Sequence, residues 1–216
     1  MSEIQPVVFL VDDDPSIRKS LHRLLTVSGF QVKTFSSAQE FLQTDRTDTP
    51  GCLILDVRLP GLDGLELQKV LAEQGTAPPI VFITGHGDIP MSVRAMKAGA
   101  IDFLSKPFSE ESLLNAVELA IEKSRRESAL TADIASIRRR LSLLTPREME
   151  VLKYVAAGQI NKQIAVEMGV VEKTIKVHRS RVMHKLQAKS IADLVRMLEK
   201  VDWSNKSSGF GSSLKG

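Results

Sequence analysis

Two stretches of sequence decide the fold class: Val7-Val8-Phe9-Leu10-Val11-Asp12-Asp13-Asp14 and Cys52-Leu53-Ile54-Leu55-Asp56. Each is a short apolar run that ends on carboxylates. Two further runs end on a hydroxyl and on an ammonium, namely Ile80-Val81-Phe82-Ile83-Thr84 and Ile101-Asp102-Phe103-Leu104-Ser105-Lys106. Such runs, separated by helical patterns, are typical of the strands of a parallel sheet, whose carboxyl ends meet at one edge. The sequence therefore predicts that these polar groups converge there.

Strand and helix patterns alternate along the first 122 residues. The expected strands are residues 6–12, 30–35, 51–56, 79–84 and 101–105. The expected helices are residues 15–28, 37–44, 64–74, 89–98 and 109–122. Five strand–helix units of this length predict an α/β doubly wound fold, that is, a (βα)5 parallel sheet with helices on both faces.

Charge divides the chain into an acidic part and a basic part. Residues 1–122 contain 10 Lys and Arg against 17 Asp and Glu, a net charge of −7, whereas residues 123–216 contain 19 against 9, a net charge of +10. This asymmetry predicts an acidic module joined to one that binds a polyanion. Because Cys52 is the only cysteine and the first residues lack the basic start of a signal peptide, we expect a cytoplasmic protein without a membrane segment.

The basic part is predicted to be helical. We expect residues 123–140 to form a helical linker, which is either a solvated spacer or one half of a short coiled coil. An all-α domain of four helices follows over residues 141–203, and the first of these helices has Thr145 as its N-cap. Residues 204–216 are rich in Ser, Gly and Lys, and we expect them to be disordered.

The strand ends form a candidate site for a cation and a phosphoryl group. Asp12, Asp13 and Asp56 would lie on neighbouring strands, where three carboxylates repel one another. A Mg²⁺ ion would relieve this repulsion because it prefers oxygen ligands. One carboxylate could then attack a phosphoryl group, while Lys106 balances the charge and the Thr84 hydroxyl donates a hydrogen bond.

These motifs give residues 1–122 a resemblance to the receiver domain of bacterial two-component response regulators. The matching stretches are Val11-Asp12-Asp13-Asp14, Leu55-Asp56-Val57-Arg58-Leu59-Pro60-Gly61-Leu62-Asp63-Gly64 and residues 84–108, the last of which is similar to the FixJ-type subfamily. The resemblance implies that Asp56 is the phospho-acceptor and that the Lys106–Pro107 bond is cis. The implied Mg²⁺ ligands are Asp12, Asp13, Asp56 and the backbone carbonyl of Arg58. The implied switch pair is Thr84 and Phe103, and Lys106 matches the lysine of the family's site.

Two helices joined by a short turn, the second of them basic, predict a helix-turn-helix. In residues 172–186, the apolar positions Ile175, Val182 and Leu186 would face the core. A stripe on another side could enter a major groove, and it consists of Lys173, Lys176, Val177 and Ser180. Basic residues beside it could neutralise phosphates, and they are Arg179, Arg181 and Lys185.

The basic part is similar to the LuxR-type DNA-binding domain. The stretches that carry the resemblance are Leu144-Thr145-Pro146-Arg147-Glu148, Gly158-Gln159-Ile160-Asn161-Lys162-Gln163-Ile164-Ala165 and Glu172-Lys173-Thr174-Ile175-Lys176-Val177-His178-Arg179. The resemblance implies that the helix at 172–186, with Thr174 among its DNA-facing residues, lies in the groove. It also implies that the last helix pairs two subunits. Part of the apolar stripe of this helix must pack on its own domain and the rest is available for pairing, and the stripe consists of Ile191, Leu194, Val195, Leu198 and Val201. Asn161 and Lys162 begin the preceding helix, where backbone amides favour a phosphate.

Together these features predict a two-component response regulator that regulates transcription and is not an enzyme with an external substrate. The implied partners are a sensor histidine kinase, double-stranded promoter DNA, RNA polymerase and a second copy of the chain after phosphorylation. Two alternatives stay open. One is a Mg²⁺-dependent phosphohydrolase with an aspartate nucleophile, although no second Asp stands two residues after Asp56. The other is a DNA-binding protein whose receiver is never phosphorylated.

Overall fold

The computed structural model describes residues 6–44, 50–85 and 88–203. The chain forms two compact units that divide between Ala129 and Leu130, and each is described by itself below. The tail at 204–216, which the sequence analysis expects to be disordered, lies outside the described residues.

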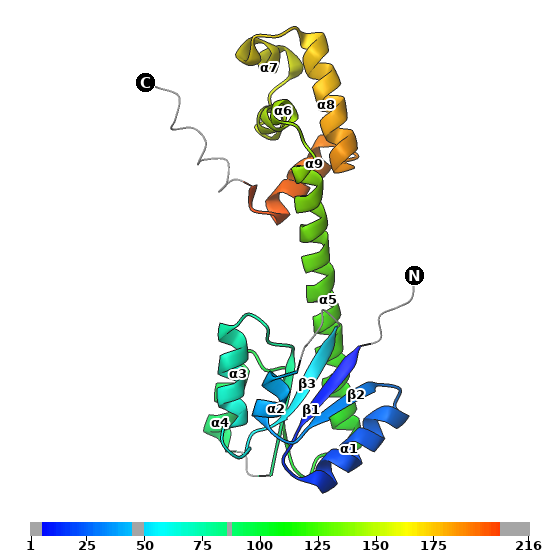
Figure 1. Cartoon of the computed structure of the whole chain (residues 1–216), viewed down its shortest axis with the longest axis vertical. Coiled ribbons are helices and arrows are strands. Elements are labelled where there is room, and N and C mark those ends of the chain that lie inside the picture. Colours follow the sequence, from blue (N-terminus) through cyan, green and yellow to red (C-terminus); the bar gives the residue numbers. More distant parts are fainter. Residues whose placement is uncertain (1–5, 45–49, 86–87, 204–216) are drawn as a thin grey trace. The chain divides into compact units, whose positions relative to one another are not determined.

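The first unit is built on a parallel sheet with the strand order β2-β1-β3-β4-β5. Figure 1 shows β1 between β2 and β3 in this sheet. All four strand pairs are parallel, which confirms the doubly wound fold predicted from the sequence. The strands are β1 (Val7–Val11), β2 (Gln31–Phe35), β3 (Gly51–Asp56), β4 (Ile80–Thr84) and β5 (Asp102–Ser105). The helices between them are α1 (Pro15–Val27), α2 (Ala38–Leu42), α3 (Gly64–Glu73) and α4 (Ile89–Lys97), and α5 (Glu110–Ser142) follows the last strand.

The sheet has a separate apolar core on each of its faces. Successive side chains of a strand point to opposite faces, so neighbours in β1 belong to different cores. Phe9 packs against Phe41 of α2, with ring centroids 5.7 Å apart, in the core that α3 and α4 also cover. Leu10 packs in the other core with Leu25 of α1 and Leu113 of α5. Burial on both faces explains why the central strands have continuous apolar sequences.

Helix α5 continues well past the limit expected for the last helix of the receiver. The sequence predicts a helix at 109–122 and a helical linker at 123–140, and in the structure they are one helix from Glu110 to Ser142. Ile137 and Leu141, near its end, are buried in the core of the second unit. The predicted limits of the linker (123–140) and of the DNA-binding domain (141–203) stay predictions, but residues inside that linker contribute to this core.

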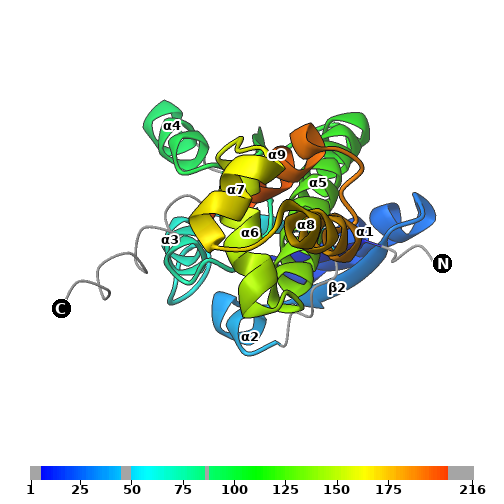
Figure 2. The same ribbon diagram turned by 90° about the horizontal axis from the view of Figure 1, so that it is seen from above.

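The second unit contains four further helices, α6 (Pro146–Ala156), α7 (Asn161–Met168), α8 (Glu172–Leu186) and α9 (Ile191–Lys200). The predicted capping box at Thr145 is present, because its hydroxyl accepts from the Glu148 amide while the Glu148 carboxylate accepts from the Thr145 amide. Gly169 ends α7 with a left-handed conformation, which turns the chain into α8. Figure 2 shows α6, α7 and α8 gathered together, in agreement with the core that they share. In the part of the chain that the structure describes, no helix has the length and apolar character needed to cross a membrane.

Gly51 allows β1 and β3 to meet closely at the start of the sheet. A Cβ atom at this position would lie 2.2 Å from the carbonyl oxygen of Val7, a distance that neither backbone can accept without moving. We therefore expect Gly51→Ala to lower the free energy of unfolding of the first unit by about 2 kcal/mol in urea unfolding followed by circular dichroism. Gly85→Ala is the control, since a Cβ there meets no atom within 4 Å. Equal losses in the two variants would contradict the proposed clash.

Candidate functional site

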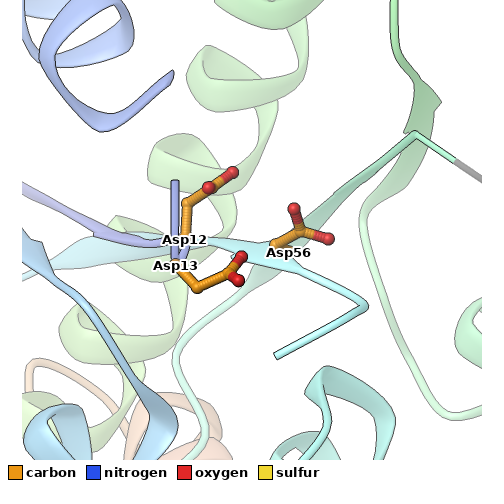
Figure 3. A group of neighbouring side chains, drawn as sticks. All are labelled: Asp12, Asp13 and Asp56. Atoms are coloured by element: carbon orange, nitrogen blue, oxygen red, sulfur yellow. The ribbon is translucent and has the colours of Figure 1, made fainter. Parts of the chain in front are cut away.

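Three carboxylates gather at the carboxyl edge of the sheet. Strands β1 and β3 are neighbours, with Val11 opposite Leu55, so the residues that follow these positions lie side by side. One oxygen atom from each of Asp12, Asp13 and Asp56 lies within 4.8 Å of those of the other two (Figure 3). Asp12 and Asp56 are buried, whereas Asp13 is exposed. The structure therefore brings together the three acids that the sequence analysis assigns to one site.

Lys106 connects the two buried carboxylates. Its Nζ atom lies 2.7 Å from Oδ2 of Asp12 and 2.7 Å from Oδ2 of Asp56. The lysine is held at this edge because its backbone amide donates to the carbonyl of Thr84, at the end of β4. The bond that follows it, Lys106–Pro107, is cis, as predicted. One ammonium thus bridges carboxylates that come from two different strands.

The remaining oxygen of each buried carboxylate accepts a hydrogen bond from the backbone. The amide of Asp14 donates to Oδ1 of Asp12 over 2.8 Å, and the amide of Arg58 donates to Oδ1 of Asp56 over 3.0 Å. Asp13 differs, because no donor among the described residues is bonded to its carboxylate. It is the carboxylate of this cluster with most freedom to bind a cation from solvent.

Burial and charge act in opposite directions on the groups of this site. Burial raises the pKa of the Asp12 carboxyl, and the hydrogen bond from Lys106 opposes that rise only in part. Burial also disfavours the ammonium of Lys106, but its hydrogen bonds to Asp12 and Asp56 outweigh this effect and raise the pKa of the lysine. Lys106 therefore keeps its positive charge. Burial makes the ionised form of Asp12 less stable, and a bound cation would offset this loss of stability.

The donor set fits a hard divalent cation. Carboxylate oxygens are the ligands that Mg²⁺ takes at about 2.0–2.1 Å, so two ligands of one ion lie at most about 4.2 Å apart. The three oxygens, which lie within 4.8 Å of one another, therefore need only small side-chain movements to share one ion. Asp14, the third acid of the sequence run, does not belong to this set. It is the N-cap of α1, where its carboxylate accepts from the amide of Ser16 over 2.7 Å.

The two predicted switch residues lie on the last two strands of the sheet. Thr84 is the final residue of β4 and is fully buried. Phe103 is half-buried in β5, and its ring centroid lies 6.1 Å from that of Phe82. Thr84 therefore lies at the carboxyl edge of the sheet, whereas Phe103 lies two residues before the end of β5, opposite Phe82.

Gly64 is a residue of the site whose role the sequence analysis did not identify. It begins α3, and a Cβ atom there would lie 2.4 Å from the carbonyl oxygen of Asp56. Its amide donates to the carbonyl of Val57, which closes the loop after β3. The sequence signal was the spacing of Gly64 from Asp56 inside the quoted motif, but only the structure shows that the two backbones touch.

The second candidate site is the exposed side of α8. Ile175, Val182 and Leu186 are buried in the core, as the helical spacing predicts. The stripe on the other side is exposed along its whole length, and it contains Lys173, Lys176, Val177 and Ser180. Lys162 and Arg181 are also exposed, and Thr174 is half-buried. Ammonium groups on one side of a helix suit the phosphates and base edges of a nucleic acid groove.

Three of the predicted DNA-contacting residues already have partners inside the second unit. Nη1 of Arg179 donates to Oδ1 of Asn161 over 2.9 Å, which joins α8 to the start of α7. Nζ of Lys185 lies 2.6 Å from Oε2 of the buried Glu148. The structure therefore gives Lys185, Arg179 and Asn161 a part in holding α8, which the sequence analysis did not anticipate.

Comparisons with known proteins identify the families of both units. Residues 8–118 match the model of the response regulator receiver domain, and residues 142–198 match that of the bacterial regulatory proteins of the luxR family. Nodulation protein W of Bradyrhizobium diazoefficiens is 51% identical over 89% of this chain and 85% of its own length. Transcriptional regulatory protein FixJ of the same organism is 44% identical over 88% of this chain and 93% of its own length.

Two solved structures of response regulators also match this chain over nearly its whole length. The structure of response regulator StyR has a TM-score of 0.80 and 50% identity, and the match covers 91% of this chain and 99% of that one. Full-length FixJ from B. japonicum has a TM-score of 0.55 and 41% identity, with coverage of 93% and 99%. Both units, with their carboxylate cluster and their basic helix, thus lie within these matches. The chain belongs to the two-component response regulators that join a receiver domain to a LuxR-type DNA-binding domain.

Proposed function

We propose that Asp56 accepts a phosphoryl group from a sensor histidine kinase, and that phosphorylation controls the binding of promoter DNA by α8. The observation that carries this proposal is the bridge that Lys106 makes between Asp12 and Asp56. An ammonium at 2.7 Å from the acceptor carboxylate is placed to balance the negative charge that a phosphoryl group adds.

Burial and contacts favour Asp56 over the other two acids as the nucleophile. The side chain of Asp12 is 0% exposed, so no phosphoryl donor can reach it, whereas that of Asp56 is 10% exposed at the surface of the cluster. Asp13 is accessible but has no bond to Lys106. In the proposed step an Oδ atom of Asp56 forms a bond to phosphorus while the bond from phosphorus to the histidine nitrogen of the kinase breaks, and the imidazole leaves.

Asp12, Asp13, Asp56 and the backbone carbonyl of Arg58 are the proposed ligands of Mg²⁺. The ion would neutralise charge on the phosphoryl oxygens during transfer. After transfer, the Thr84 hydroxyl donates to a phosphoryl oxygen and the ring of Phe103 turns inward. This movement alters the surface formed by α4, β5 and α5, where Ile89, Val93 and Met96 of α4 expose apolar side chains.

The altered surface is proposed to pair with that of a second copy. Pairing brings two DNA-binding units to neighbouring half-sites and raises their effective concentration. The α8 stripe of each then lies in a major groove, with Lys162 and Arg181 near phosphates. Ile191 of α9 is 40% exposed, which leaves it available for contact between subunits, whereas Leu194 and Leu198 are buried in their own unit.

The regulator acts in the cytoplasm. When it is bound to promoter DNA it recruits RNA polymerase, and activation of transcription is the expected outcome.

Replacing Asp56 by Asn should abolish phosphorylation without unfolding the receiver. We expect the wild type to gain the mass of one phosphoryl group after incubation with Mg²⁺ and acetyl phosphate, whereas Asp56→Asn gains none, because an amide is not a nucleophile towards phosphorus. Intact mass spectrometry measures this directly. Asp63→Asn is the matched control, since Asn also caps a helix and Asp63 is the N-cap of α3. Equal mass gains in wild type and Asp56→Asn would reject Asp56 as the acceptor.

Mg²⁺ should stabilise the receiver through Asp13. At a concentration of one hundred times its dissociation constant, the ion is expected to add about 2.7 kcal/mol to the free energy of unfolding, seen as a higher melting temperature. Asp13→Asn should lose most of this response, because it removes the exposed ligand. Asp14→Asn is the neighbouring control and should respond as the wild type does, since Asp14 caps α1. The metal assignment fails if Asp13→Asn and wild type respond alike.

Removing the two ammonium groups of the α8 stripe should lower the affinity for DNA. It should also make that affinity depend less on the salt concentration. We expect Lys173→Ala/Lys176→Ala to bind its operator at least about tenfold more weakly. If both lysines contact phosphates, the slope of log affinity against log salt should become shallower by about two. The charge-matched control is Lys19→Ala/Lys33→Ala, which removes two exposed receiver lysines. Fluorescence anisotropy over a range of salt concentrations makes the measurement, and a slope identical to that of the wild type would exclude phosphate contacts by Lys173 and Lys176.

A further inference from the structure

The C-terminal end of α8 is anchored by a residue of α5. Leu186 is the last residue of α8, and its side chain is buried. Its carbonyl oxygen accepts a hydrogen bond of 2.7 Å from Nη1 of Arg140. The last carbonyls of a helix have no partner within that helix, and they carry its negative dipole end. A guanidinium is therefore a strong partner for this carbonyl.

Arg140 is itself held in place within the second unit. It lies between Ile137 and Leu141, along the part of α5 that is buried in the core shared with Leu186. Its side chain is half-buried, whereas the neighbouring Arg138 and Arg139 are exposed. Burial therefore distinguishes Arg140 from Arg138 and Arg139 in the structure, although the sequence alone gives no reason to separate the three.

A second set of contacts fixes the same end of α8. Nζ of Lys185 donates to the carbonyl of Leu143 over 3.0 Å and to Oε2 of Glu148 over 2.6 Å. The hydrogen bond from Lys185 lowers the pKa of the buried Glu148 carboxyl, which therefore stays ionised. Two successive residues at the end of α8 are thus joined to the end of α5 and to the turn and helix that follow it.

We propose that Arg140 is a positioning residue for DNA recognition, which sets the direction of α8 by holding the Leu186 carbonyl. This inference rests on the proposed function of α8. Leu186 lies ten residues beyond Lys176, a distance of about 15 Å along a helix. A tilt of about 10° at the anchored end would move the stripe by roughly 2.6 Å over that length, which is enough to break hydrogen bonds to base edges.

The anchor predicts a particular pattern of lost affinity. Base contacts require a defined direction of α8, whereas contacts to phosphates tolerate small movements because they depend on charge over a longer range. Loss of Arg140 should therefore reduce binding to a specific operator and leave binding to unrelated duplex nearly unchanged. A residue that contacted DNA phosphates would weaken both kinds of binding and would reduce the salt slope.

The test compares Arg140→Gln, Arg140→Lys and the matched control Arg139→Gln in the full chain. An operator is first selected from a random duplex library by the wild type after phosphorylation with Mg²⁺ and acetyl phosphate, and all variants are treated in the same way. The affinities for this operator and for an unrelated duplex are then measured by fluorescence anisotropy at several salt concentrations. We expect Arg140→Gln to lose about tenfold in operator affinity and less than about twofold for the unrelated duplex, with an unchanged salt slope. Arg140→Lys should recover part of the loss, since an ammonium can also donate to a carbonyl.

Each outcome decides the inference. Equal operator affinity in Arg140→Gln and wild type, or an equal loss in Arg139→Gln, would overturn it. A shallower salt slope for Arg140→Gln would also overturn it, because Arg140 would then contact phosphate. If the wild type selects no duplex, the proposed function fails and this inference fails with it. Should Arg140→Gln melt below the assay temperature, Arg140→Lys decides the matter: a folded Arg140→Lys must show the selective loss of operator affinity.

Discussion

The receiver site depends on the ion pairs that the ammonium of Lys106 makes with Asp12 and Asp56. Asp12 and Asp56 come from neighbouring strands and are both buried, so their charges would repel each other strongly without a cation between them. Lys106 is 2.7 Å from each. It reaches that position from the end of the fifth strand, which places three separate strand ends in one electrostatic cluster. The sheet order therefore decides the chemistry, because a different order would separate these groups.

The sequence predicts this arrangement because parallel strands give a rule that connects distant residues. Asp12 and Lys106 are 94 positions apart, yet both follow apolar runs whose carboxyl ends must share an edge. No such rule connects Lys185 with Glu148 or Arg140 with Leu186. These pairs depend on how helices pack in the second unit, and basic residues on a helix have the same appearance in sequence whether they face DNA or a buried partner. The sequence therefore predicts the exposed stripe of α8, but it does not show that Lys185, which it places beside the stripe, pairs with the buried Glu148.

Helix α5 shows a second limit of prediction from sequence. Its polar middle, with Arg125 and Arg126, is compatible with a solvated spacer and with half of a coiled coil, and the change of pattern in the sequence predicts that the linker ends at residue 140. The structure shows that Ile137 and Leu141 belong to the core of the DNA-binding unit. Two apolar residues within a charged segment are a weak signal until their partners are known. For this reason the boundary between linker and domain depends on packing, and composition alone does not locate it.

The two units use charge in opposite ways. In the receiver, the carboxylates of Asp12 and Asp56 are buried and close together, so the proposed addition of a phosphoryl group would strongly change the electrostatic energy of the site. On α8, the decisive charges are exposed and separated along a helix, so each interacts weakly with the protein and remains available to a polyanion. Contacts from such a helix to base edges, unlike contacts to phosphates, require that the helix has a fixed direction. We propose that the hydrogen bonds of Arg140 and Lys185 supply that constraint, since they hold one end of α8 without covering its stripe.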